Sequence, residues 1–176
     1  MAPEFDSLVN QADYIVRGTV TAITSEWRSD AHGQHIITKV KFDVSEVIKG
    51  IPPSPLVLVM LGGRIGNYQM VVEGTPNFIV GEESILFVHG NGRQFFPLVA
   101  IMYGMYPVSL DTASGQRFVH RSNGSPLYDV KDVSLPMTAA NALGKGAARP
   151  LTSAEFTGKI RASASQHQPP PPVNAN

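Results

Sequence analysis

The feature that most constrains this chain is a series of short segments with a two-residue period, each ended by glycine or proline. In the clearest segment, Ile36–Ser45, the period of two holds over the nine residues Ile36–Val44. Successive side chains of a β-strand point to opposite faces, so this period is typical of a strand with one buried face. Such segments recur from Ala12 to Arg121 and predict an all-β body, a small barrel or sandwich.

Strands are predicted by this pattern at residues 14–22, 36–45, 56–61, 68–72, 84–89, 94–102, 105–110 and 116–121. Gly18 lies inside the first strand and indicates a bulge or bend, as the closing of a small barrel requires. Leu56–Leu61 is apolar on both faces, which predicts a central strand covered on each side. We expect a polar loop at Ser29–Gln34 and hairpin turns at Gly90–Gly92 and Asp111–Gly115.

Short helices are predicted at both ends of the body. The first spans Pro3–Gln11, where apolar residues recur at helical spacing. The second begins near Thr152, because Glu155 follows it by three residues and the two form a capping-box pattern. Residues 166–176 contain four consecutive prolines and are expected to form a solvated tail. We therefore expect one domain over residues 1–165, followed by this tail.

The lack of cysteine excludes several kinds of site, and the charge balance disfavours one class of protein. Lys+Arg and Asp+Glu both number 14, so the chain lacks the basic surplus of a dedicated nucleic-acid binder. Without cysteine there is no disulfide scaffold, thiol nucleophile or thiolate zinc site. The longest apolar run, Leu56–Leu61, is too short to cross a bilayer. The N-terminus has no signal-peptide pattern, which leaves a cytoplasmic protein and a processed, exported protein as alternatives.

Three stretches carry a resemblance to known proteins: Ala12–Val20 (ADYIVRGTV), Val44–Gly50 (VSEVIKG) and Gly74–Phe87 (GTPNFIVGEESILF). Their order resembles a widespread group of uncharacterised, mostly exported bacterial proteins. It is also similar to a cysteine-free relative of the netrin-like module of tissue inhibitors of metalloproteinases. The resemblance implies an oligonucleotide/oligosaccharide-binding (OB)-like β-barrel, closed or partly open, with short flanking helices. It also implies secretion or a periplasmic location.

The metalloproteinase inhibitors reach the protease zinc through an N-terminal cysteine. Here the terminus is Met1-Ala2-Pro3 and there is no cysteine, so we do not expect inhibition by that route. Inhibition through a loop stays open as an alternative.

No local motif marks a catalytic site. The nucleophile elbow G-x-S-x-G is absent, and the glycine-rich stretch Gly62–Asn67 lacks the Lys-Ser/Thr ending of a phosphate loop. Glu82 and Glu83 are neighbours in sequence and point to opposite faces of a strand, so they do not form a paired-carboxylate site. With Glu73 they are interpreted as polar residues that guard a strand entry.

The histidines give no predicted metal site. His32 and His35 have a chelating spacing but lie in a polar segment, without a strong indication of a third ligand. His89 and His120 lie at strand ends and are a second pair to consider. We predict no metal, no cofactor and no catalytic residue.

The best binding candidates are exposed aromatic and basic side chains, the combination that a ligand-binding OB-like barrel uses. They are Trp27, Lys39, Lys41, Tyr68 and Arg93.

A second apolar concentration lies in Phe95–Pro97 and Met102–Tyr106. If one of its faces is exposed, it is a surface for a partner or for self-association.

The sequence therefore predicts a non-catalytic, exported module that binds another protein or itself. Binding of an oligosaccharide or single-stranded nucleic acid, and loop-mediated protease inhibition, are the alternatives. An enzyme with a dispersed active site also stays open, because such a site leaves no local pattern.

Overall fold

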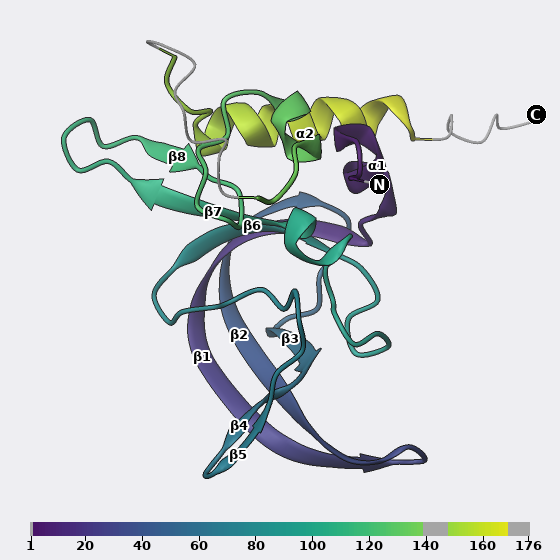
Figure 1. Ribbon diagram of the computed structural model, residues 1–176. Coiled ribbons are helices and arrows are strands. Elements are labelled where there is room, and N and C mark those ends of the chain that lie inside the picture. Colours follow the sequence, from purple (N-terminus) through teal and green to yellow (C-terminus); the bar gives the residue numbers. More distant parts are fainter. Residues whose placement is uncertain (1, 139–147, 169–176) are drawn as a thin grey trace, which may run out of the picture.

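The computed structural model describes residues 2–138 and 148–168 (Figure 1). Most of the regular structure is β, arranged as one antiparallel sheet of six strands in the order β3-β2-β1-β6-β7-β8, with β4 and β5 as a separate hairpin. The strands are β1 (Tyr14–Asp30), β2 (Gly33–Lys49), β3 (Leu56–Leu61), β4 (Gly63–Ile65), β5 (Tyr68–Met70), β6 (Glu83–Val88), β7 (Met105–Leu110) and β8 (Arg117–Val119). The predicted β-rich body is confirmed.

The two longest strands, β1 and β2, form a curved hairpin that extends away from the rest of the sheet (Figure 1). The predicted polar loop at Ser29–Gln34 is wrong, because Ser29 pairs with Gln34 and Asp30 with Gly33 in a continuous ladder. The expected irregularity at Gly18 is confirmed by a register shift between Arg17 and Gly18. A Cβ on Gly18 would lie 2.9 Å from the carbonyl oxygen of Asp43, so this bend requires glycine.

Strand pairing within the part of the chain that the structure describes does not close the sheet, so the closed form of the expected barrel is wrong. Among residues 2–138 and 148–168, β3 pairs only with β2 and lies at one end of the sheet, which also contradicts its predicted central position. Its free edge is instead covered by the segment after β6. The Asn91 side chain accepts from the Val59 N–H (3.0 Å) and donates to the Val57 carbonyl (2.8 Å), and the Leu61 N–H donates to the Phe95 carbonyl (2.9 Å).

The strand predicted at 94–102 is also wrong. This stretch contains turns, a bridge between Leu98 and Val88, and part of the 3-10 helix η1 (Ile101–Gly104). The hairpin predicted after it is confirmed, since β7 and β8 pair across the Asp111–Gly115 turn.

Two apolar cores lie on opposite faces of the sheet. The inner core fills the curve of the sheet and includes Val16, Val40, Phe42, Leu58 and Leu86. The outer core lies between the sheet and the helices and includes Leu8, Ile15, Phe87, Tyr106 and Phe156. The inner and outer residues alternate along β1 and β6, and both faces are buried there, which explains why these strands need apolar residues at successive positions.

Two helices cover the outer face of the sheet beside β6, β7 and β8 (Figure 1). They are α1 (Phe5–Gln11) and α2 (Ser153–Gln166), and a second 3-10 helix, η2 (Val130–Ser134), lies near α1. The predicted capping box of α2 is confirmed: the Glu155 N–H donates to the Thr152 hydroxyl (3.2 Å), and the Thr152 N–H donates to the Glu155 carboxylate (2.9 Å). Gln166 belongs to α2, and residues 169–176 of the predicted tail lie outside the described residues.

A lysine at the end of β2 donates hydrogen bonds to the end of α1. The Lys49 ammonium donates to the carbonyls of Val9 (2.7 Å), Asn10 (3.4 Å) and Ala12 (2.7 Å), which are the acceptors left free where a helix ends. Burial lowers the pKa of Lys49. Gly50 follows with φ +73°, and a Cβ there would lie 2.3 Å from the Asp13 carbonyl oxygen. The Lys-Gly pair is therefore explained by this close approach of three chain segments.

Candidate functional site

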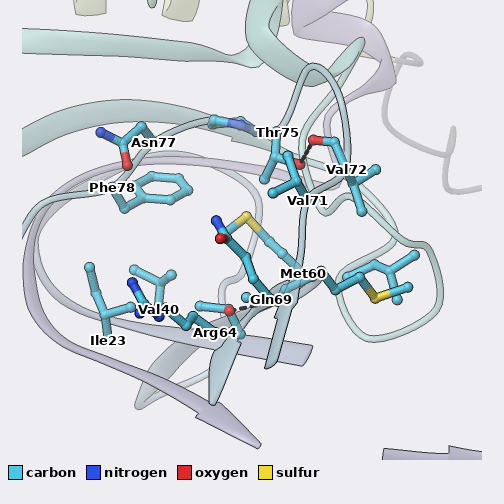
Figure 2. A pocket seen from close by; sticks show the side chains of 16 residues that line it. Ile23, Val40, Met60, Arg64, Gln69, Val71, Val72, Thr75, Asn77 and Phe78 are labelled. Carbon is cyan, nitrogen blue, oxygen red and sulfur yellow. Dashed lines mark hydrogen bonds between the residues drawn. The ribbon is translucent and has the colours of Figure 1, made fainter. Parts of the chain in front are cut away.

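The strongest candidate site is a groove of about 350 Å³ between the inner face of the β1–β2 hairpin and the chain from Leu61 to Phe78. Figure 2 shows Ile23 and Val40 on one side, with Met60, Val71 and Val72 among the residues that complete the lining. Ile23 and Val40 are directly opposed across β1 and β2. Arg64 is the one charged side chain in the lining that the structure describes. The groove is therefore suited to apolar ligand groups.

A pair of glycines allows the β4–β5 hairpin to lie directly on β1 and β2. Gly63 has φ +142°, and a Cβ there would lie 2.3 Å from the Thr38 hydroxyl and 2.6 Å from the Ser25 hydroxyl. These hydroxyls are 3.0 Å apart, and Thr38 also donates to the Gly62 carbonyl (2.7 Å). The hydrogen bonds fix β4 against the long hairpin and so form one side of the groove.

An exposed aromatic pair lies beside the groove. The rings of Trp27 on β1 and Tyr68 on β5 meet edge to face, with centroids 5.5 Å apart. Trp27 is 42% exposed and Tyr68 is 66% exposed. Trp27 shares a face of β1 with Ile23, which lines the groove. The structure thus brings together the two aromatic residues that the sequence singled out.

The basic candidates are not brought to the same place. Lys39 pairs with Thr24 and Lys41 with Ala22, positions that alternate with Trp27 along β1 and so lie on the opposite face of the hairpin. Lys39 is also held by Glu26 at 2.7 Å.

The fifth candidate, Arg93, lies in the segment that covers β3. One of its guanidinium nitrogens is 3.7 Å from the Asp13 carboxylate. The predicted set of five binding residues is therefore divided. The aromatic pair lies beside the groove, the two lysines share the opposite face of the hairpin, and Arg93 lies beside β3.

The histidines form separate local contacts. His32 and His35 flank Asp30 at the tip of the long hairpin, each with a ring nitrogen 3.6 Å from a carboxylate oxygen. Within residues 2–138 and 148–168, no three His, Asp or Glu side chains form a group that could hold a metal ion.

His89 and His120 are far apart. His89 lies 3.2 Å from the Asp13 carboxylate, whose pKa is lowered chiefly by the Gly90 N–H that donates to it. The His120 N–H donates to the Pro107 carbonyl, and Pro107 pairs with Ser84. The five steps along the chain from Ser84 to His89 span about 16 Å in an extended strand. These two histidines therefore do not share a site.

Half burial lowers the pKa of His120, and its ring nitrogen lies 3.4 Å from the Ser109 hydroxyl.

Glu83 is part of an ion-pair network on the outer face of the sheet. Its carboxylate lies 3.4 Å from Arg17 and 3.6 Å from Arg117. Arg17 also contacts Glu46 at 3.2 Å, and Glu46 contacts Arg161 of α2 at 2.9 Å. The network joins β2, β1, β6, β8 and α2, which supports a structural role for Glu83 rather than an acid–base role.

The second apolar concentration divides between core and surface. Met105 and Tyr106 are buried, whereas Phe95 is 69% exposed. Val71, at 76% exposure, and Ile23 were not singled out as binding residues from the sequence. Their patterns are ordinary for strands and turns, and only the fold places both at the groove.

No family model matches the chain, and no curated protein matches it. Among the described helices, none has the length and hydropathy needed to span a membrane.

Proposed function

We propose that this protein is a non-catalytic, exported binding module with a partly open OB-like body, and that the groove receives an apolar side chain from an extended segment of a partner protein. The observation that carries the proposal is the exposed Trp27–Tyr68 pair beside an apolar groove. Exposed aromatic residues next to a concave apolar surface are typical of binding sites.

A nucleic-acid ligand is less well supported, because the predicted aromatic and basic residues lie in different places. Single-strand binding combines aromatic stacking with a positively charged track for the backbone. Lys39 and Lys41 lie on the face opposite Trp27, so the aromatic pair has no lysine track beside it. An oligosaccharide needs no such charge, and the exposed aromatic pair alone favours it as the second candidate. No observation on the described residues favours a loop-mediated protease inhibitor.

The chain has a single tryptophan, so the emission of Trp27 reports directly on this site. Peptides selected from a displayed random library, an array of oligosaccharides and a mixed-sequence single-stranded DNA are titrated against the protein. We expect peptides with apolar residues to shift the Trp27 emission.

Two variants test whether peptide binding takes place at the groove or elsewhere on the surface. Val71→Asp introduces a charge at the groove and is expected to weaken peptide binding by about tenfold or more, because a charge against an apolar ligand group is unfavourable. Phe95→Asp introduces the same charge at an exposed apolar residue outside the groove and serves as the matched control. Peptide binding that tolerates Val71→Asp, or binding of an oligosaccharide alone, would overturn the proposed function.

A further inference from the structure

The long strand β1 has an unpaired edge over much of its length. On the side away from β2, β6 pairs only with Tyr14–Thr19, and Val20 makes the last backbone hydrogen bonds, with Gly81 and Glu82. Within the described residues, Thr21–Asp30 pairs with β2 alone. These ten residues extend about 33 Å. Figure 1 shows this half of the hairpin beyond the end of β6.

The outer edges of the two terminal strands, β3 and β8, are covered by other parts of the chain. Asn91 and Phe95 cover the edge of β3, and β8 is covered by backbone bonds from the Val119 N–H to Leu151 and from the Leu127 N–H to Val119. Natural proteins cover or shorten strand edges because an exposed edge pairs readily with another strand. A long edge left open on β1 therefore points to a strand supplied from outside the chain.

The direction of the backbone groups along this edge follows from the neighbouring strands. The Gly62 N–H donates to the Ile36 carbonyl, so the backbone groups of Ile36 point away from β1. Its partner Trp27 must then point its own backbone groups away from β2, because opposed residues of an antiparallel pair share this orientation. By alternation, Ile23 and Ser25 also present their N–H and C=O groups to the open edge.

From this edge we infer that the protein forms a symmetric dimer in which β1 pairs antiparallel with β1 of a second copy. Opposed residues must lie on the same face of the joined sheet, so their positions in the two identical strands differ by an even number. One residue is then opposed to its own copy, and the two-fold axis passes between these two copies. An axis at Ser25 opposes Ile23 to Trp27 of the second copy, twice by symmetry. Both side chains are large, apolar and exposed, at 38% and 42%. A β-branched residue opposite an aromatic residue is a favourable cross-strand pair.

Other axes fit less well. An axis at Glu26 opposes two carboxylates, which is unfavourable. An axis at Trp27 pairs only the seven residues Thr24–Asp30 before the hairpin turn, whereas the axis at Ser25 pairs the nine residues Thr21–Ser29.

Overall charge also permits the association of two copies. The formal net charge of the chain is zero, so there is no long-range repulsion between them. Because the axis is perpendicular to the joined sheet, the two grooves open on the same face. The dimer is formed by the backbone edge of β1 and the ligand is bound in the groove, so either proposal stands if the other fails, although both involve Ile23 and Trp27.

Sedimentation velocity on the full chain, from low micromolar to submillimolar concentration, tests the inference. We expect the mass to rise toward twice the 18.9 kDa of one chain, with a concentration-dependent shift of Trp27 emission in the absence of any ligand. Two variants act on the edge. Thr24→Glu opposes Glu26 of the second copy, while within its own chain it lies opposite Lys39. Ser29→Pro removes an N–H that points to the open edge.

Thr24→Glu is expected to weaken the dimer about tenfold, because the like-charge contact occurs twice. Gln116→Glu adds the same charge at an exposed residue beside the β7–β8 turn and should leave the dimer unchanged. Circular dichroism confirms that each variant is folded. A mass that stays at that of one chain over the whole range, or a dimer that tolerates both Thr24→Glu and Ser29→Pro, would overturn the inference. So would pairing of the edge with a peptide while the chain stays monomeric.

Discussion

Replacing Gly50 by alanine measures how much the close approach of β2 to the start of β1 contributes to stability. Gly50 has φ +73°, and a Cβ there would lie 2.3 Å from the Asp13 carbonyl oxygen and 3.0 Å from the Tyr14 Cα. Gly115 has nearly the same φ, +72°, but a Cβ there meets nothing within 4 Å. The two substitutions therefore impose the same backbone strain, and only Gly50→Ala adds a steric overlap.

The expected losses of stability follow from the backbone strain and the steric overlap. A non-glycine residue in the left-handed region costs about 1 to 2 kcal/mol, which is the whole expected loss for Gly115→Ala. Forcing a methyl group into a filled space costs about 1 to 3 kcal/mol more, because backbone rather than a flexible side chain must move. Gly50→Ala should then lower the free energy of unfolding by about 2 to 5 kcal/mol.

Urea denaturation followed by circular dichroism gives both values under the same conditions. The difference between the two variants isolates the overlap from the backbone strain. If Gly50→Ala costs no more than Gly115→Ala, the three segments around Lys49 are not as closely packed as described, and the explanation of the Lys-Gly pair fails.

Three further outcomes are expected. Lys49→Met keeps the aliphatic stem but removes the ammonium that donates to the carbonyls at the end of α1. Urea titrations should show a free energy of unfolding lower by about 1 to 2 kcal/mol, because desolvation of the ammonium offsets part of its hydrogen bonding. The control Lys39→Met breaks an ion pair at the surface and should cost under about 1 kcal/mol. The Arg149 side chain and the Thr152 N–H lower the pKa of Glu155 from 4.5 to about 2. The contribution of the Glu155 carboxylate to folding stability is therefore present above pH 4.5 and lost as the pH falls toward 2. The drop in melting temperature over that range should be smaller in Glu155→Gln. Asn91→Leu removes the side-chain bonds that cover β3 and should cost about 1 to 3 kcal/mol, with faster amide hydrogen exchange at Val59 as the local readout.

The sequence by itself determined the local structure. A period of two predicted most of the strands, because a strand with one buried face must alternate. The Thr152–Glu155 spacing predicted the start of α2, because both hydrogen bonds of a capping box form within four residues. Gly18 indicated a bend, and the bulge lies there.

Tertiary structure decided what depends on partners distant in the sequence. Leu56–Leu61 is apolar on both faces, yet it is an edge strand, because its second neighbour is the Asn91 side chain and a loop rather than a strand. The polar residues Ser29 and Gln34 belong to strands, because pairing across the hairpin outweighs their weak intrinsic preference.

The candidate site shows the same division. The alternation pattern of the sequence identified Trp27 and Tyr68 as exposed aromatic residues, but they meet only because Gly62 and Gly63 turn the β4–β5 hairpin onto β1. The lysines were separated from them by the register of β1 and β2, in which a single step moves a side chain to the opposite face. Alternation in a sequence records that a face is buried, whereas register and open edges are set by contacts between distant segments.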